Sequence, residues 1–183
     1  AIALIEESVA LDRKAGNMPQ LYSSLIQMGY GCQLRGEVDK CDQCLKEALD
    51  ISNSLEHSQS IVGGYWLLGG YYLLGLCYFD KGDYVKAKEF FEKLNETLEK
   101  AGDKFEQMNA SPFLIWTYIE LGEFEKAKNL VDNLRRTALE LKHDDLVAKA
   151  DALTAMMFRA QKRWKESIKY FEKSLEEHEA LSA

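Results

Sequence analysis

The chain has 183 residues, of which 46% are hydrophobic and 29% charged, and its formal net charge is −7. Such a composition is that of an ordinary soluble globular protein. The negative balance argues against the clustered cations with which proteins bind nucleic-acid phosphates. We therefore expect neither nucleic acid nor a membrane as a partner, whereas a basic or apolar peptide fits the charge.

A turn at Gly36, within LRGEVDKCDQCLKEAL, is the first of four turns that begin similar segments. The later copies are DKGDYVKAKEFFEKL, LGEFEKAKNLVDNL and QKRWKESIKYFEKSL, and their turn residues are Gly82, Gly122 and Lys162. Successive turn residues are 46, 40 and 40 positions apart. Self-similarity at a fixed period is the signature of repeat proteins, so we predict repeats of about 40 residues.

Each turn is followed by a predicted helix whose packing positions share one face. A large residue stands two positions after the turn, a small one follows three positions later, and further positions follow at spacings of four and three. These spacings place all of them on one stripe of a helix. The large and small residues are, in chain order, Val38 and Cys41, Tyr84 and Ala87, Phe124 and Ala127, and Trp164 and Ser167.

The stretch from Ile61 to Phe79 precedes the second turn and has no charged side chain over 19 residues. This length is close to the roughly 20 residues that a helix needs to cross a bilayer. Five glycines interrupt the stretch, and neither flank has the excess of Lys and Arg that orients a membrane span. We therefore predict a helix of a soluble protein, with Gly75 and Gly69 as positions of close packing.

The pattern in this stretch resembles that of the tetratricopeptide repeat. The chain reads YxxLGxxY from Tyr71 and AxxxF from Ala87, where the family has WxxLGxxY followed by AxxxF. The first-helix half is weaker in the last two copies, which have Ile115 and Ala155 in place of the glycine. The resemblance implies an all-α fold, in which helix hairpins stack into a solenoid with the form of a right-handed superhelix.

The repeat register predicts one orphan second helix followed by four helical hairpins. The orphan helix covers residues 1–15, and the hairpins cover residues 18–55, 61–100, 104–141 and 144–182. We expect these elements to form a single repeat domain over residues 1–183, cut from a longer array. Repeats of about 40 residues resemble the long-helix subtype of the family, which occurs in peptide receptors, motor light chains and sensory arms of signalling ATPases.

The position of Pro112 leaves two possibilities for the first helix of the third hairpin. Extrapolation by one period starts this helix near Lys104, in which case the proline removes one backbone hydrogen bond and kinks the helix. In the alternative, Ser111 caps a shorter helix with Pro112 in its first turn. We expect the kinked helix, because the segment KFEQMN has good helix propensity.

Four cysteines are the candidate metal ligands. Cys41 and Cys44 form a C-x-x-C pair, and with Cys32 and Cys77 they could in principle bind zinc. Cys41 and Cys32 fill packing positions of the repeat, however. We therefore interpret the four as structural thiols of a reduced, cytoplasmic protein, and we predict no metal site.

Catalytic motifs are not found. Adjacent acidic residues such as Glu176 and Glu177 point to different sides of a helix, so we interpret them as solvated faces rather than acid–base pairs. The sequence has no phosphate-binding loop, nucleophile elbow or metal-binding helix motif. We predict that the chain is not an enzyme and has no cofactor.

The resemblance places the first helix of each hairpin on a concave groove, where partners bind. One stripe of these helices is aromatic in the middle of the chain and cationic toward its end. Alternatively, packing between helices buries the aromatic residues of this stripe, so that they contact no partner. We expect the aromatic residues to anchor apolar groups, Asn109 to clamp a backbone and the cations to bind an acidic group. The candidates are Tyr30, Tyr72, Phe79, Asn109, Trp116, Lys149, Met156 and Arg159.

Two functions fit these features. The first is a protein–protein interaction module, a scaffold that binds a peptide or protein segment in its groove. The second is a structural or sensory arm of a larger signalling or transcription-regulating protein, which engages its own chain or a second copy. A homodimer through terminal or groove surfaces belongs to the second.

Overall fold

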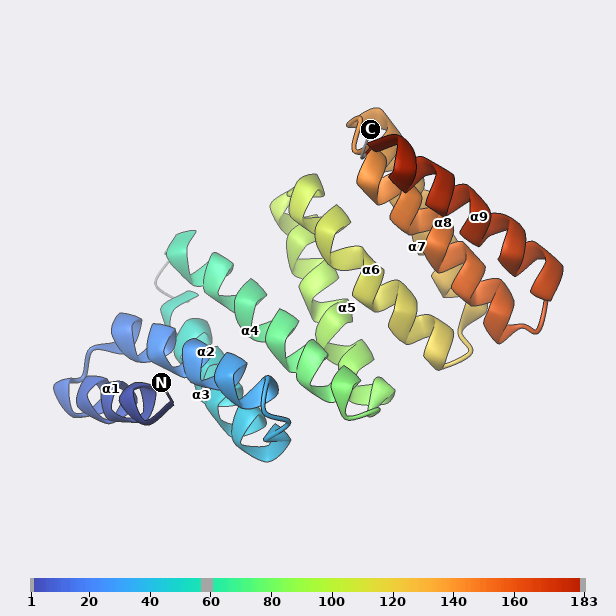
Figure 1. The fold of residues 1–183 in the computed structure, drawn as a ribbon. Coiled ribbons are helices and arrows are strands. Elements are labelled where there is room, and N and C mark those ends of the chain that lie inside the picture. Colours follow the sequence, from blue (N-terminus) through green and yellow to red (C-terminus); the bar gives the residue numbers. More distant parts are fainter. Residues whose placement is uncertain (1, 57–60, 182–183) are drawn as a thin grey trace. The chain divides into compact units, whose positions relative to one another are not determined.

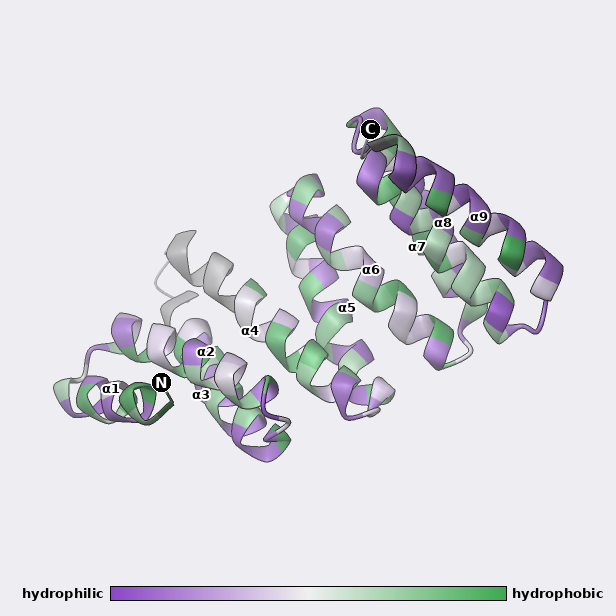
Figure 2. Ribbon diagram, viewed as in Figure 1, coloured by the Kyte–Doolittle hydropathy of each residue, from purple (hydrophilic) through white to green (hydrophobic). Residues whose placement is uncertain are grey.

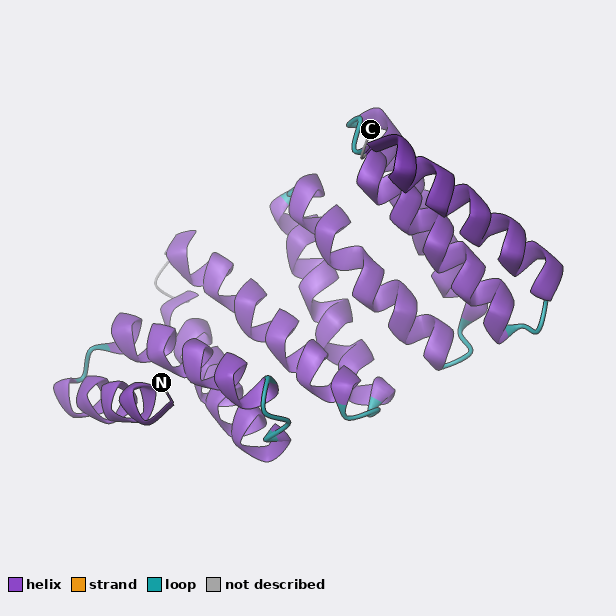
Figure 3. Cartoon of the chain, viewed as in Figure 1, coloured by secondary structure: helices purple, strands orange, loops and turns teal. Residues whose placement is uncertain are grey.

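The computed structural model describes residues 2–56 and 61–181, except for the side chains at 55, 56, 61–67 and 181. Nine helices and no strand are found within these residues (Figures 1 and 3). All of them lie within the predicted ranges to within a residue. The helices are α1 (Ile2–Ala15), α2 (Met18–Gln33), α3 (Val38–Glu56), α4 (Ile61–Asp80), α5 (Tyr84–Ala101), α6 (Lys104–Glu120), α7 (Phe124–Glu140), α8 (Asp144–Ala160) and α9 (Trp164–Leu181).

The chain divides into two compact units, residues 1–94 and residues 95–183, and the division falls within α5. In the first unit α1 packs on α2, α2 on α3 and α3 on α4. In the second unit α6 packs on α7, α7 on α8 and α8 on α9, and α6 also contacts α8. The organisation of the whole chain as one domain, its place in a longer array and its superhelical form stay predictions.

The predicted turns are confirmed by backbone conformation. Gly36, Gly82 and Gly122 have φ angles of 71°, 79° and 73°, and Lys162 has the same left-handed conformation with φ of 59°. In each turn the residue after this one donates its N–H to the carbonyl five residues back, as from Asp83 to Tyr78 at 2.9 Å. This bond closes the preceding helix in a Schellman motif. Glycine is favoured in such turns because it has no Cβ to clash with the backbone.

Glycines also set how closely the helices of a hairpin approach. Hydrophobic and hydrophilic residues alternate along the helices (Figure 2). A Cβ at Gly75 would lie 2.4 Å from Cε1 of Phe91, and one at Gly29 would lie 2.4 Å from Cδ2 of Leu45. The expected packing role of Gly75 is therefore confirmed. Gly69 is less constrained than we expected, because its Cβ would meet only the Tyr22 hydroxyl at 3.4 Å.

The closely packed neighbour is Gly70, whose Cβ would lie 2.5 Å from Cδ2 of Leu49. Gly70 and Leu49 are both buried. The helix α4 that carries these glycines begins at Ile61. No helix in the described part of the chain combines the length and the apolar composition that a membrane crossing requires.

Pro112 lies inside α6, as the register predicts. The helix begins at Lys104, and Oδ1 of Asp103 caps it by accepting the backbone N–H of Glu106 at 3.0 Å. The alternative of a shorter helix capped by Ser111 is therefore wrong. Instead, the Ser111 hydroxyl donates to the backbone carbonyl of Gln107 one turn earlier. A kink at Pro112 stays a prediction.

Candidate functional site

A pocket of about 250 Å³ lies between α6 and α8 in the second unit. These two helices run in the same direction, so residues one period apart face the same space (Figure 1). The pocket is lined by four such pairs, each 40 positions apart. They are Asn109 with Lys149, Pro112 with Ala152, Phe113 with Leu153, and Trp116 with Met156.

Six of the eight lining residues are apolar, and the other two form one polar edge. Asn109 and Lys149 are exposed and stand one turn before Pro112 and Ala152 on their helices. The ring of Trp116 is held at the other end, where its indole N–H donates to Oε1 of Glu120 at 3.0 Å. The side chain of Trp116 remains 37% exposed. The site therefore combines an apolar floor with a cation on its rim.

Arg159 lies beside a neighbouring cavity rather than in this pocket. That cavity of about 410 Å³ is bounded by residues of α6, α7 and α8, including Ile119, Phe124 and Arg159. Met156 lines both spaces. Two exposed cations, Lys149 and Arg159, therefore stand on α8 on either side of Met156.

The remaining candidates belong to the first unit. Tyr30 is exposed near the end of α2, whereas Tyr72 and Phe79 on α4 are half-buried. Burial raises the pKa of the Tyr72 phenol, and the Phe79 ring packs edge to face on Tyr84 with centroids 5.2 Å apart. The structure thus brings together Asn109, Trp116, Lys149 and Met156 in the pocket between α6 and α8. Tyr30, Tyr72 and Phe79 do not line that pocket.

Comparison with known proteins assigns the fold. A family model described as the tetratricopeptide repeat matches residues 69–97, which include the motif of α4 and the start of α5. The nine helices of the described residues follow the same hairpin plan throughout. Residues 69–97 thus match a tetratricopeptide repeat, and the described helices have a tetratricopeptide-like repeat fold.

Solved structures with tetratricopeptide-like repeats extend this likeness over almost the whole chain. A Podospora anserina protein described as a kinesin light chain with nearly identical repeats has a TM-score of 0.83 at 16% identity, covering 99% of this chain and 86% of its own. BtubC, also called BKLC, of P. vanneervenii has a TM-score of 0.78 at 20% identity, and the match covers 98% of this chain and 72% of BtubC. At such identities the likeness concerns the fold alone.

A third similar structure is a Rap protein complexed with Competence and Sporulation Factor. Its TM-score is 0.70 at 15% identity, and the match covers 99% of this chain and 59% of the Rap chain. Among curated proteins no sequence matches the chain. The tetratricopeptide-repeat fold is commonly a protein–protein interaction module and is typically non-catalytic.

Two residues that line the pocket between α6 and α8 were absent from the stripe predicted from the sequence. Phe113 and Leu153 each lie four positions after a predicted groove residue, Asn109 or Lys149. A spacing of four keeps a residue on the same face of a helix, so the signal was present in the sequence. The predicted stripe instead included the residues three positions after Asn109 and Lys149, which are Pro112 and Ala152. It therefore covered only one side of the pocket.

The cysteines contribute packing to the first unit. Cys32, Cys41 and Cys77 are buried, and Cys44 is half-buried. A hydrogen bond with the Cys77 thiol, together with burial, raises the pKa of Cys41. Among the described residues no cluster of three or more histidine, cysteine or acidic side chains could hold a metal ion. The assignment of the four cysteines as structural thiols stays a prediction.

Proposed function

We propose that this chain is an interaction module that binds a peptide or protein segment in the pocket between α6 and α8. The single observation that supports the proposal is the set of four residue pairs that line one apolar pocket from two neighbouring first helices. We also propose that the chain acts without catalysis of its own and in the cytoplasm, where its four cysteines would remain thiols.

The size of the pocket favours one side chain as the anchored group. Small-molecule and cofactor sites usually have volumes of about 300–1,000 Å³, and this pocket has about 250 Å³. A large aliphatic or aromatic side chain of a partner would contact Phe113, Trp116 and Met156. Burying such a side chain contributes about 1.5–3 kcal/mol, which is more than a tenfold change in affinity.

The charges at the pocket favour an acidic residue close to that anchor. Lys149 is exposed on the rim, and Arg159 lies further along the same helix. Asn109 stands opposite Lys149 and offers an amide that can donate to and accept from a peptide backbone. The proposed partner is therefore a segment with one large apolar residue flanked by Asp or Glu.

A randomised peptide library selected on the purified chain tests this function. We expect enrichment of peptides that pair a large apolar residue with Asp or Glu. Enriched peptides should bind the Trp116→Ala and Met156→Lys variants at least tenfold more weakly. Trp164→Ala is the matched control, because Trp164 is exposed on α9 outside the pocket.

Two results would count against this function. One is a selection without sequence enrichment. The other is a set of enriched peptides that bind the Trp116→Ala variant as tightly as the unaltered chain. Circular dichroism of each variant would first establish that it is folded.

A second candidate function, a structural arm that pairs with a second copy of itself, is favoured by the outer face of α9. Trp164, Ile168, Phe171 and Leu175 are exposed and recur at helical spacing. Leu175 has the repeat position of Arg135, which on α7 contacts Asp151 of the next helix. On α7 this position faces α8, whereas Leu175 on α9 is exposed. A twofold pairing of α9 with another α9 needs only this one surface.

Light scattering during gel filtration separates this second candidate from the first. We expect a dimer that becomes a monomer in the Ile168→Glu, Leu175→Glu variant, whereas Leu139→Glu, an exposed leucine on α7, leaves the mass unchanged. A monomeric unaltered chain at about 100 μM would rule out the self-pairing function.

A further inference from the structure

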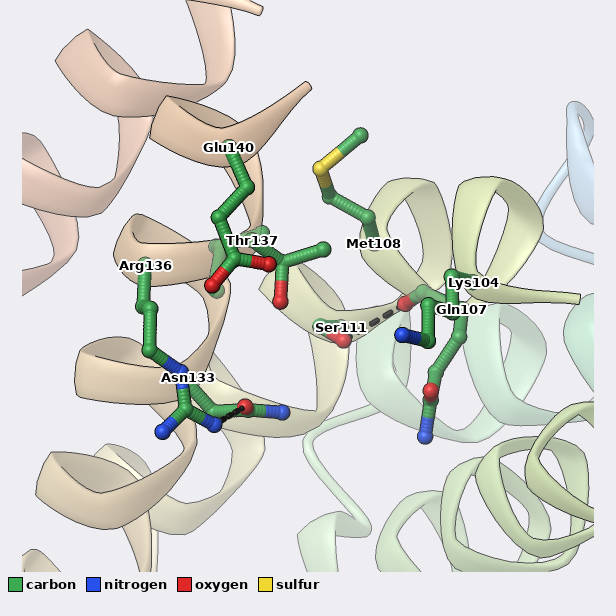
Figure 4. Close-up of a pocket in the computed structure, with 9 residues that line it drawn as sticks. Lys104, Gln107, Met108, Ser111, Asn133, Arg136, Thr137 and Glu140 are labelled. Carbon is green, nitrogen blue, oxygen red and sulfur yellow. Dashed lines mark hydrogen bonds between the residues drawn. The ribbon is translucent and has the colours of Figure 1, made fainter. Parts of the chain in front are cut away.

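A second cleft of about 330 Å³ opens between α6 and α7 and shares no lining residue with the apolar pocket (Figure 4). Met108 and Ser111 are buried in it, whereas Gln107, Asn133 and Thr137 are half-buried. The charged side chains lie at its exposed rim. The full lining is Lys104, Gln107, Met108, Ser111, Asn133, Leu134, Arg136, Thr137 and Glu140.

One repeat later the corresponding space is filled by an ionic cluster. The residues 40 positions after Ser111, Asn133 and Thr137 are Asp151, Lys173 and Glu177. Asp151 is fully buried and forms ion pairs with Arg135 of α7 and with Lys173 of α9, the latter at 3.0 Å. A buried carboxylate between two cations therefore occupies this repeat position in the α8–α9 hairpin.

Glu177 also belongs to the cluster, which corrects our interpretation of Glu176 and Glu177 as solvated faces. Its Oε1 lies 3.8 Å from Nζ of Lys173. Burial and the nearby Asp151 carboxylate raise the pKa of Glu177. The last hairpin thus has three ionisable side chains, Asp151, Lys173 and Glu177, where the preceding hairpin has short neutral ones.

In the α6–α7 hairpin the neutral side chains leave this space open and supply hydrogen-bond donors. Nη2 of Arg136 donates to Oδ1 of Asn133 at 2.7 Å, which directs the Asn133 amide nitrogen away from Arg136 (Figure 4). Nε2 of Gln107 donates to Oδ1 of Asn95 at 3.2 Å. Asn133 and Thr137 line the cleft, where an amide N–H and a hydroxyl can donate to a ligand.

The charges of the rim favour an anion. Lys104 and Arg136 contribute two positive charges and Glu140 one negative charge, so the cleft has a net positive charge. We propose that this cleft binds a carboxylate group of a small organic acid or of an acidic side chain, in the repeat position that Asp151 fills in the next hairpin. The bound carboxylate accepts from Arg136 and from the Asn133 amide, and Lys104 adds a second cation.

Succinate is the first probe, with the neutral isostere succinamide as its control. Titration of the ¹⁵N-labelled chain at low salt should shift the side-chain amide signal of Asn133 with succinate and leave it unshifted with succinamide. Affinity should fall about tenfold in Arg136→Gln, because a charge-assisted hydrogen bond is lost. It should rise in Glu140→Gln, since a like charge leaves the rim.

The matched control is Lys128→Gln, which removes an exposed cation of α7 that pairs with Asp132 at 3.1 Å. It should leave succinate binding unchanged. The Ser111→Asp, Asn133→Lys variant rebuilds two members of the next hairpin's cluster and should abolish binding while the chain stays folded. Equal binding of succinate and succinamide, or equal affinity in Arg136→Gln and Lys128→Gln, would overturn the proposal.

The peptides Ac-Ala-Glu-Ala-NH₂ and Ac-Ala-Gln-Ala-NH₂ distinguish the two sources of the carboxylate. Binding of the Glu peptide without binding of succinate assigns the cleft to an acidic side chain of a partner. Binding of succinate alone assigns it to a small acid. If neither probe shifts the Asn133 signal at 50 mM, the cleft is no carboxylate site.

Discussion

Among the described glycines of the first unit, Gly75 has the closest set of neighbours around the place where a Cβ would stand. A Cβ there would lie 2.4, 2.6 and 2.8 Å from three atoms of the Phe91 ring, and Phe91 is itself buried. Overpacking of this kind costs about 1–3 kcal/mol. We therefore expect Gly75→Ala to lower the free energy of unfolding by about that amount, measured by urea denaturation.

Gly69→Ala is the control for this substitution, because it adds the same methyl group to the same helix. Its Cβ would meet only the Tyr22 hydroxyl at 3.4 Å, so the better helix propensity of alanine should stabilise the chain by up to about 1 kcal/mol. A second variant, Gly75→Ala with Phe91→Val, should recover part of the loss. Equal stabilities of Gly75→Ala and Gly69→Ala would contradict the packing role.

Lys162 occupies a turn position that three other repeats fill with glycine. Its φ of 59° is a conformation that costs a residue with a Cβ about 1–2 kcal/mol. Lys162→Gly should therefore raise the free energy of unfolding by about 1 kcal/mol and raise Tm in a thermal scan. Lys165→Gly, at the exposed second residue of α9, should instead lower stability by up to about 1 kcal/mol.

Among the elements, α6 is the helix with an internal defect. Pro112 cannot donate to the carbonyl of Met108, and its ring presses on that carbonyl at a cost of about 3 kcal/mol. We expect Pro112→Ala to stabilise the second unit by up to that amount. Because Pro112 lines the pocket between α6 and α8, the same variant should change the affinity for peptides selected on the unaltered chain. A variant that is less stable than the original would show that the helix is built around the proline.

The contact of Asp151 with Arg135 and Lys173 joins three helices, α7, α8 and α9. Removing one partner of a buried ionic group leaves the others uncompensated and costs about 3–5 kcal/mol. We expect Asp151→Asn to destabilise the second unit by this amount in urea denaturation. Asp132→Asn, which removes an exposed partner of Lys128 at 3.1 Å, should cost less than about 1 kcal/mol.

The helices were predictable from the sequence because the copies keep the same spacing of packing residues even where the residues differ. The ionic cluster around Asp151 was not predictable. The repeat positions of Asp151 are Leu25, Tyr71 and Ser111, so an acid there reads as an exception to the apolar stripe. Its partners lie 16 and 22 positions away. They meet it only because three helices pack together, and a one-dimensional pattern contains no such information.

At the scale of the whole molecule, the same limit applies to the candidate site. The register predicted Asn109, Trp116, Lys149 and Met156, since pairs 40 positions apart on parallel first helices face one space. Tyr72 and Phe79 continued the stripe in sequence, yet both are half-buried, and Phe79 packs on Tyr84. How deeply an aromatic side chain is buried depends on the neighbouring helix, which the stripe does not describe.

The division into two compact units leads to a prediction about how the chain unfolds. In repeat proteins each element contacts only its neighbours, so stability is a sum of local terms and can be lost in one part first. All four cysteines lie in the first unit, and therefore their reaction with a thiol reagent reports on that unit alone. Hydrogen exchange in α7–α9 reports on the second unit.

We expect the Asp151→Asn variant to lose exchange protection in α7–α9 at a urea concentration where Cys41 and Cys77 still resist the thiol reagent. Gly75→Ala should give the reverse order, with thiol reaction first and α7–α9 still protected. Each variant is thus the control for the other, since the two substitutions lie in different units. In both variants, protection of α7–α9 from hydrogen exchange and protection of the cysteines from the thiol reagent could instead be lost at the same urea concentration. That result would show that the 183 residues unfold as one cooperative body.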